Sequence, residues 1–161
     1  MKEQQYQFSY KEYDSIDELP EDQQWLLNEA REVTETAYAP YSHFQVAAVA
    51  KMANGQIVAG SNQENASFPV GLCAERVLLA SISSLFPRVP VETIAISYKS
   101  ENQKSDHPIS PCGICRQSLQ EFESRVGHPI QLIMGGMSGK VIVVDTASKL
   151  LPLAFTSDEL R

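Results

Sequence analysis

Three cysteines and one glutamate are the residues whose types and spacing could carry chemistry. Glu75 follows Cys73 by two residues, and Cys112 and Cys115 are three residues apart. Residues three apart share one face of a helical turn, so Cys112 and Cys115 can bind one ion while Cys73 completes the ligand set. Three protein ligands leave one position of tetrahedral zinc open, and a water bound there is acidified toward a pKa of about 7. Glu75 is then suited to stay outside the metal shell and to move protons.

Both cysteine motifs are expected at the first turn of a helix. Cys73 opens a predicted helix over residues 73–86, and Pro111 opens another helix that ends at Gly127. The free amide groups and the dipole at a helix N-terminus stabilise thiolates, and only the thiolate binds metal. The cysteine count is 3, and an odd number without a secretion signal argues for thiolate or metal chemistry rather than a disulfide framework.

A sheet must position these two helices. Apolar periodicity predicts a further helix from Pro20 to about residue 37, and Asn54-Gly55 predicts a tight hairpin between two strands. The predicted strands are residues 44–53, 56–61, 91–98, 130–134 and 140–145, and a short helical turn is expected near residue 150. This α-β-β-α-β-α-β-β order implies an α/β fold with a mixed five-stranded sheet and helices on both faces.

The chain length of 161 residues fits one domain. Residues 1–20 are polar with scattered aromatic side chains, and we expect them to form an N-terminal extension, either an added strand or an arm packed on the domain. Residues 21–161 are then the single domain. With 43% hydrophobic and 20% charged residues, the composition is that of a globular protein that can bury a core.

The charge balance argues against several partners. The chain has 13 basic and 20 acidic residues, a net charge of -7, and its lysines and arginines form no run that could neutralise several phosphates. We therefore expect no nucleic acid partner. The N-terminus lacks the apolar segment of a signal peptide, and no stretch approaches the roughly 18 apolar residues that span a bilayer. A cytoplasmic protein without membrane attachment is expected.

The motifs around the candidate residues resemble those of the small, homotetrameric cytidine deaminases with a three-cysteine zinc site. The resemblance covers about residues 38–160 and is carried by AYAPYSHFQVAA, NQENAS, GLCAERVLLA, ISPCGICRQSLQEF and LLPLAF. It implies a cytidine deaminase-like α/β/α fold, a bound Zn²⁺ and a nucleoside as the small-molecule substrate. It also implies that a homotetramer deaminates cytidine and deoxycytidine hydrolytically to uridine and deoxyuridine plus ammonia, a reaction of pyrimidine salvage.

The resemblance assigns the metal site residue by residue. Cys73, Cys112 and Cys115 would be the zinc ligands, and Glu75 would be the catalytic acid and base that also holds N3 of the pyrimidine. Three thiolates leave the zinc site with one net negative charge, which weakens the acidification of bound water. Arg76, three residues beyond Cys73, is expected to offset that charge by donating hydrogen bonds to the ligand sulfurs. The alternative is a surface arginine in an outward salt bridge.

The substrate-binding residues implied by the resemblance are Phe44, Asn62, Glu64, Ala74, Ser110 and Phe155. Asn62 and Glu64 would bind the ribose 3′-hydroxyl, with the carboxylate accepting and the amide able to donate. Phe44 would line the nucleoside pocket, and the backbone of Ala74 and Ser110 would lie near the ring and its leaving amine. Phe155 would reach toward the site of a neighbouring subunit.

Three other interpretations stay open at this point. A C-x-x-C pair is also typical of thioredoxin-like redox proteins, and His107 as a fourth ligand would make a non-catalytic zinc-binding module. A blasticidin-type or other nucleoside-analogue deaminase would share the three-cysteine site, although NQENAS and LLPLAF favour cytidine. Residues 1–20 and an insert over residues 99–107 have no counterpart among the family motifs, and Phe68 stands where the family often has tyrosine.

Overall fold

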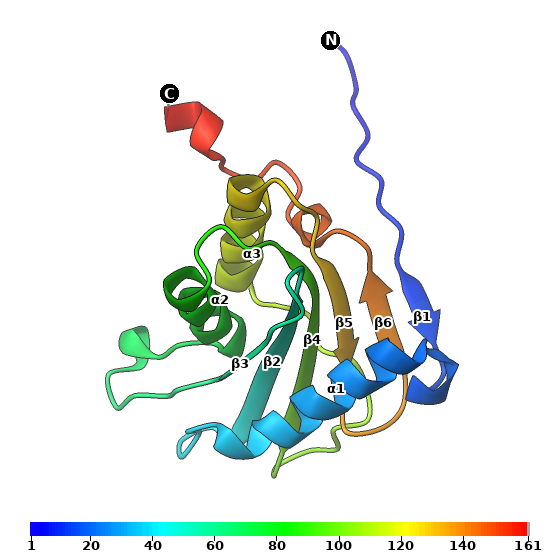
Figure 1. Cartoon of the computed structure of the whole chain (residues 1–161), viewed down its shortest axis with the longest axis vertical. Helices are drawn as coiled ribbons and strands as arrows, with labels where there is room; N and C mark the ends of the chain where they lie inside the picture. The colour runs from blue at the N-terminus through cyan, green and yellow to red at the C-terminus, as the bar shows by residue number, and fades with distance from the viewer. Residues whose placement is uncertain (161) are drawn as a thin grey trace.

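The computed structural model describes residues 1–160, and its centre is a mixed sheet of six strands in the order β1-β6-β5-β4-β2-β3 (Figure 1). The strands are β1 (Lys11–Tyr13), β2 (Phe44–Met52), β3 (Ile57–Ser61), β4 (Val91–Ser100), β5 (Gln131–Gly135) and β6 (Val141–Val144). β4 and β5 run parallel, and every other neighbouring pair is antiparallel. The expected mixed α/β sheet is confirmed, but it has six strands rather than five.

The sixth strand comes from the N-terminal extension. β1 pairs antiparallel with β6 at the sheet edge, where Lys11 lies opposite Val143. Its lysine bonds the carboxylate of Asp145 at 3.2 Å, and Lys140 bonds Glu12. Residues before β1 run on along this edge and away from the sheet (Figure 1), with the Tyr6 hydroxyl donating to the carbonyl of Lys149 at 2.6 Å. The extension is thus an added strand preceded by an arm.

Helices cover both faces of the sheet, as expected (Figure 1). α1 (Glu21–Val33) buries Leu26, Leu27 and Ala30 against one face, and α2 (Ala74–Leu85) and α3 (Gly113–Val126) cover the other. Along β4 the side chains alternate between these two cores, so Ile94 and Ile96 face α2 and α3 while Ala95 faces α1. A strand buried on both faces reads as a continuous apolar run, which is why VETIAISY predicts a strand.

The N-terminal turn of α2 is held close to β3 by a glycine. A Cβ added to Gly60 would lie 2.5 Å from the backbone nitrogen of Leu78 and 2.8 Å from the carbonyl oxygen of Ala74. No side chain fits between two backbones that close, so Gly60 allows α2 to approach the hairpin. This contact fixes the end of α2 from which Cys73 and Glu75 project.

α3 is anchored at both ends by side chains that bond backbone groups. At its start, Arg116 donates to the carbonyl oxygens of Pro111 at 2.8 Å and Leu150 at 3.2 Å. At its end, the buried carboxylate of Glu123 accepts from the amides of Ile130, Ala147 and Ser148, which satisfies the charge without a basic partner. Gly127 then ends the helix in the left-handed conformation, with φ of 64°.

The element boundaries differ from the predicted ones by a few residues. The first helix ends at Val33 and continues as a 3-10 turn, Thr34–Thr36, instead of running to residue 37. β4 extends two residues beyond Tyr98, because its end pairs with the start of β2. The hairpin turn is confirmed, with Gly55 at φ of 82°. None of the helices within residues 1–160 has the length and apolar character needed to cross a membrane.

Candidate active site

The three cysteines lie together where α2 and α3 begin. Their sulfur atoms are all within 4.8 Å of one another. The Sγ of Cys112 is 3.8 Å from that of Cys73 and 3.5 Å from that of Cys115. Cys73 and Cys112 are the residues directly before α2 and α3, and the two helices lie side by side (Figure 1), so their first turns meet.

The spacing of the sulfurs fits one zinc ion. Zinc–sulfur bonds of about 2.3 Å in tetrahedral geometry separate two ligand sulfurs by about 3.8 Å. Within residues 1–160, no histidine or carboxylate joins the cluster. His107 instead lies within hydrogen-bond distance, 3.1 Å, of the buried hydroxyl of Tyr98. The cluster therefore offers three ligands, which leaves a position for water, and the four-ligand structural zinc site with His107 does not form.

The thiols share protons when no metal is bound. Hydrogen bonds from Cys115 and then Cys112 lower the pKa of Cys73 to about 6, against the opposing effect of its partial burial. The pKa of Cys115 is raised, because its proton is held in the bond to Cys73 and because it is buried. The site thus already favours a thiolate at Cys73, the form that binds metal.

Glu75 projects from the first turn of α2 next to the cysteines. It is only 5% exposed, and burial raises the pKa of its carboxyl, against hydrogen bonds that act to lower it, one of them with Cys115. Within residues 1–160, no basic side chain forms an ion pair with it. A carboxyl whose pKa is shifted upward by burial can hold a proton and release it at neutral pH, which suits acid and base chemistry.

A cavity of about 490 Å³ opens beside Glu75 and the cysteines. Its lining includes six of the expected residues, namely Phe44, Asn62, Glu64, Ala74, Glu75 and Ser110. Cys73 and Cys112 line it as well, while Cys115 is fully buried behind them. The structure therefore brings the candidate metal centre, the buried carboxyl and the polar residues of NQENAS to one cavity.

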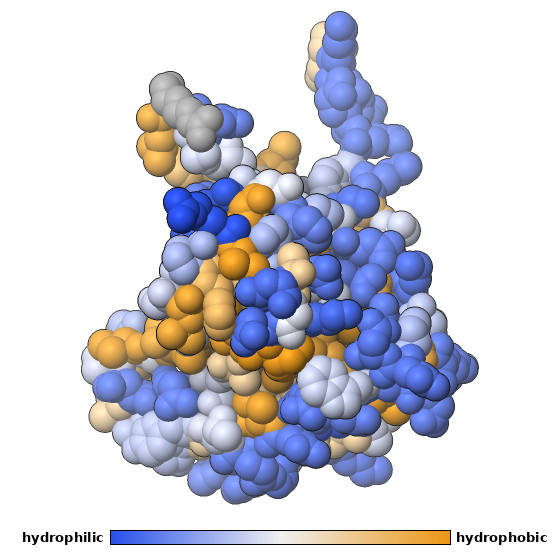
Figure 2. Space-filling view, in the orientation of Figure 1, coloured by the Kyte–Doolittle hydropathy of each residue, from blue (hydrophilic) through white to orange (hydrophobic). Residues whose placement is uncertain are grey.

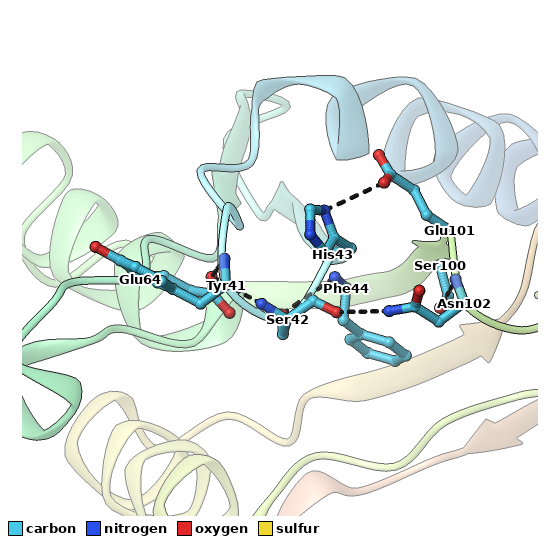
Figure 3. A network of polar contacts seen from close by, with 8 residues as sticks. All are labelled: Tyr41, Ser42, His43, Phe44, Glu64, Ser100, Glu101 and Asn102. Carbon is cyan, nitrogen blue, oxygen red and sulfur yellow. Dashed lines mark hydrogen bonds and ion pairs between the residues drawn. The ribbon is translucent and has the colours of Figure 1, made fainter.

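Glu64 and Ser42, two polar residues of the cavity lining, belong to a network of polar contacts (Figure 3), and this part of the lining with Asn62 is called the polar end of the cavity. One carboxylate oxygen of Glu64 accepts from the backbone amides of Tyr41 at 2.9 Å and Ser42 at 3.3 Å. Burial acts to raise the pKa of Glu64, but these bonds and one from the Ser42 side chain outweigh it, so the pKa is lowered. Glu64 is thus an ionised acceptor in the cavity lining, and the two backbone amides bond the same one of its two oxygens.

The Asn62 side chain is tied to the start of β2. Its Oδ1 accepts from the amide of Val46 at 2.7 Å, and its Nδ2 donates to the carbonyl of Phe44 at 2.9 Å. The amide group still has a second N–H, because an asparagine NH₂ carries two donors. Asn62 therefore fixes the backbone next to Phe44 and keeps one donor for a ligand.

Tyr98 packs behind Phe44, and the sequence did not indicate it as a site residue. The ring of Phe44 stacks on the ring of Tyr98, with centroids 5.0 Å apart and an angle of 22° between the planes. The ring of Tyr98 also makes an edge-to-face contact with the ring of His107. Tyr98 is the last residue of the apolar strand predicted over residues 91–98, so the sequence indicates a core residue there. Tyr41 and Ser42 were also missed, because they act through backbone amides that no side-chain motif reveals.

Two predicted residues lie outside the cavity. Phe155 is 58% exposed and is absent from the cavity lining, and its carbonyl accepts from Gln117 at 2.9 Å. Among the described residues, Arg76 makes no hydrogen bond to a cysteine sulfur, although its charge contributes to lowering the pKa of Cys73. Its side chain lines a separate hollow between α2 and α3, together with Glu121.

Comparisons with known proteins agree with this geometry. The family model described as cytidine and deoxycytidylate deaminase zinc-binding region matches residues 20–127. A cytidine deaminase of Halalkalibacterium halodurans is 36% identical over 140 residues, which are 87% of this chain and 98% of that protein. The crystal structure of cytidine deaminase from Burkholderia pseudomallei superposes with a TM-score of 0.69 at 36% identity, covering 81% of this chain and 97% of that one. A blasticidin-S deaminase of Bacillus cereus is less similar, at 27% identity over 133 residues, 81% of this chain and 90% of that protein.

Proposed function

The chain belongs to the cytidine deaminase family and is an enzyme of that type, a hydrolase, and we propose that it deaminates cytidine and deoxycytidine with a zinc cofactor. Water and the nucleoside would give uridine or deoxyuridine plus ammonia. The observation that carries this proposal is the placement of three cysteine sulfurs within 4.8 Å of one another beside a buried glutamate in one cavity.

Cys73, Cys112 and Cys115 would hold the metal. When bound there, zinc supplies a water of lowered pKa as the nucleophile for C4 of the pyrimidine. The chain's own contribution is to present three thiolates from two rigid helix ends and to bury Cys115 completely. Because no fourth protein ligand joins the described cluster, the geometry supports a catalytic rather than a structural site.

Glu75 would move the protons of the reaction. It takes a proton from the attacking water and delivers one to N3 of the pyrimidine, which neutralises the ring as C4 becomes tetrahedral. The carboxylate then takes the proton of the new C4 hydroxyl and delivers it to the exocyclic amine, which leaves as ammonia while C4 becomes the carbonyl of uridine. Burial raises the pKa of Glu75, which strengthens the carboxylate as a base for the proton of the attacking water.

The polar end of the cavity would bind the sugar. The second oxygen of Glu64 accepts the 3′-hydroxyl proton, and the remaining N–H of Asn62 donates to the same hydroxyl oxygen. Phe44 forms a wall beside them and is held by Tyr98 behind it. Ribose and deoxyribose both carry a 3′-hydroxyl, so both nucleosides fit, whereas free cytosine lacks this binding energy.

A nucleoside fits the cavity better than a nucleotide or a nucleic acid. Glu64 and Glu75 both line it, and among residues 1–160 no lysine or arginine belongs to its lining. A phosphate would therefore meet negative charge without a basic partner. The NQENAS residues at the sugar end favour cytidine over blasticidin, in line with the higher identity to cytidine deaminases.

Assembly into a homotetramer is part of the proposal. Apolar surface gathers over α2, α3 and the segment before α2 (Figure 2). Phe68, in the segment before α2, is 74% exposed, and Ile114, in α3, is 62% exposed. Exposed apolar residues around a cavity are typical of a surface covered by another subunit. Phe155 is exposed as well, which suits its proposed reach toward a neighbour's site. Three reduced thiols also favour a reducing compartment, so we expect the enzyme in the cytoplasm.

Product analysis tests the proposal directly. Purified, zinc-loaded protein is incubated with cytidine, deoxycytidine, cytosine and blasticidin S, and ammonia release is followed together with the nucleoside product. Turnover of the two nucleosides, with poor turnover of cytosine, is expected. Turnover of blasticidin S in preference to cytidine would refute the substrate assignment, and absence of any deamination by protein with one zinc per chain would refute the reaction.

A further inference from the structure

The insert over residues 99–107 contacts the turn that precedes β2 (Figure 3). The amide of Glu101 donates to the carbonyl of His43 at 3.1 Å, and the Asn102 side chain donates to the carbonyl of Ser42, also at 3.1 Å. The Glu101 carboxylate lies 3.2 Å from Nδ1 of His43. Three contacts thus join two loops that are far apart in the sequence.

The turn is held in a backbone conformation that needs support. His43 has a φ of 54°, which is uncommon for a residue other than glycine. Such a conformation persists when the surrounding structure fixes it. Here the carbonyls of Ser42 and His43 are both bonded by the insert, and the His43 amide donates to the carbonyl of Ala39 at 3.0 Å. The insert therefore supplies two of the bonds that hold this turn.

The same turn orients Glu64. The amides of Tyr41 and Ser42, which bond the Glu64 carboxylate, precede the strained residue directly. A change in the backbone at His43 rotates the neighbouring peptide groups, so it also redirects these two amides. The contacts consequently form a chain from Asn102 and Glu101, through Ser42 and His43, to the carboxylate at the polar end of the cavity.

The insert is itself fixed at its far end. A Cβ added to Gly139 would lie 2.0 Å from the carbonyl oxygen of Asp106, and one added to Gly136 would lie 2.3 Å from that of Ser105. The Ser105 hydroxyl also accepts from the amide of Ser100 at 2.9 Å. The loop after β5 therefore packs directly against the backbone of residues 105 and 106. This contact fixes the insert, which can then act as a rigid support for the turn before β2.

We propose that Glu101 and Asn102 are positioning residues that hold Glu64 in place for the 3′-hydroxyl of the nucleoside, so that the insert contributes to substrate specificity. This inference rests on the proposed function, in which Glu64 binds that hydroxyl. Neither residue lines the cavity or touches the reacting atoms, and their effect passes through the turn at Ser42 and His43.

The experiment compares cytidine with 3′-deoxycytidine as substrates of wild type, Asn102→Ala and Glu101→Ala. Gln103→Ala is the matched control, because it truncates the adjacent exposed side chain, which makes no hydrogen bond or ion pair within residues 1–160. Asn102→Ala should lower kcat/KM for cytidine roughly three- to tenfold, as expected for the loss of one hydrogen bond, and mainly by raising KM. The same change should leave kcat/KM for 3′-deoxycytidine nearly unaltered, because that substrate has no hydroxyl for Glu64 to bind.

Glu101→Ala should act in the same direction while leaving the Asn102 bond intact, so the proposal can be tested even if one variant folds poorly. Melting temperatures close to that of Gln103→Ala identify variants that are folded. Equal losses on both substrates, or no loss in either variant, would overturn the positioning role. Failure of the wild-type enzyme to distinguish the two substrates would overturn the sugar-binding role of Glu64, and the positioning role with it.

Discussion

Replacing Glu75 with glutamine tests the role of this side chain in proton transfer separately from folding and zinc binding. Glutamine has the same shape and can hydrogen-bond, but it cannot exchange a proton with water or with the pyrimidine. Burial raises the pKa of Glu75 because it penalises the charged form, so a neutral amide of the same shape is well tolerated at this position. We therefore expect Glu75→Gln to keep its fold and its zinc.

The expected loss of turnover is large. Acid and base catalysis by one group is typically worth about 10² to 10⁴ in rate. Glu64 is the other carboxylate that lines the cavity, and its hydrogen bonds to the Tyr41 and Ser42 amides hold it at the polar end. Because that group cannot take over the proton transfer, we expect kcat to fall by about 10³ or more, toward the upper end of the range.

The assay combines ammonia release from cytidine with the zinc content of the same preparation. Glu121→Gln is the control, since it makes the same chemical change on α3 at an exposed position outside the cavity. Glu75→Gln with one zinc per chain and residual turnover below about one thousandth of wild type agrees with the reasoning. Turnover within tenfold of wild type, or loss of zinc together with activity, would refute it.

Three further predictions concern the support of the site. Arg76→Gln should lower kcat, because it removes a positive charge near the ligand set. Adding Cys73→His reduces the negative charge of the ligand set and should recover part of this loss. Simple additivity of the two effects in a double-mutant cycle on metallated protein would contradict a charge-compensating role. Glu123→Gln should lower the free energy of unfolding by at least about 2 kcal/mol in urea titrations, because its buried oxygens accept three backbone amides; a change no larger than that of Glu121→Gln would contradict this. Phe155→Ala should weaken assembly and activity together in light scattering and kinetics, and a fully active monomer would show that the two are independent.

Local signals predicted most of the elements that carry the site. Asn54-Gly55 specifies its own hairpin because glycine readily adopts the positive φ that the turn requires. Cys73 and Cys112 precede helices whose apolar periodicity is clear in the sequence, so their place at helix starts follows from a pattern of a few residues. Features of this kind depend on short stretches of chain, and short stretches can be interpreted without knowing the rest of the fold.

The parts that the sequence did not predict depend on contacts between distant segments. β1 has three residues, and its bonds to β6 are made by backbone groups and by lysines at the edge, so no apolar pattern marks it. The stacking of Phe44 on Tyr98 requires the register of β2 against β4, which is set by the whole sheet. The contacts of the insert with the turn at His43 belong to the same class, because each side by itself resembles an ordinary polar loop.

The unused bonding capacity of Asn62 and Glu64 defines what the polar end of the cavity accepts. Asn62 already bonds β2 through Oδ1 and one N–H, and one oxygen of Glu64 already accepts two amides. The second N–H of Asn62 and the second oxygen of Glu64 take part in none of these backbone bonds, and a hydroxyl group complements both, because it can donate one hydrogen bond and accept another. A phosphodiester at the 3′ position has no proton to donate and brings a negative charge toward the Glu64 carboxylate. With the 3′-hydroxyl bound there as proposed, we expect the site to disfavour nucleotides within a nucleic acid chain, which is a more specific reason than the net charge of -7.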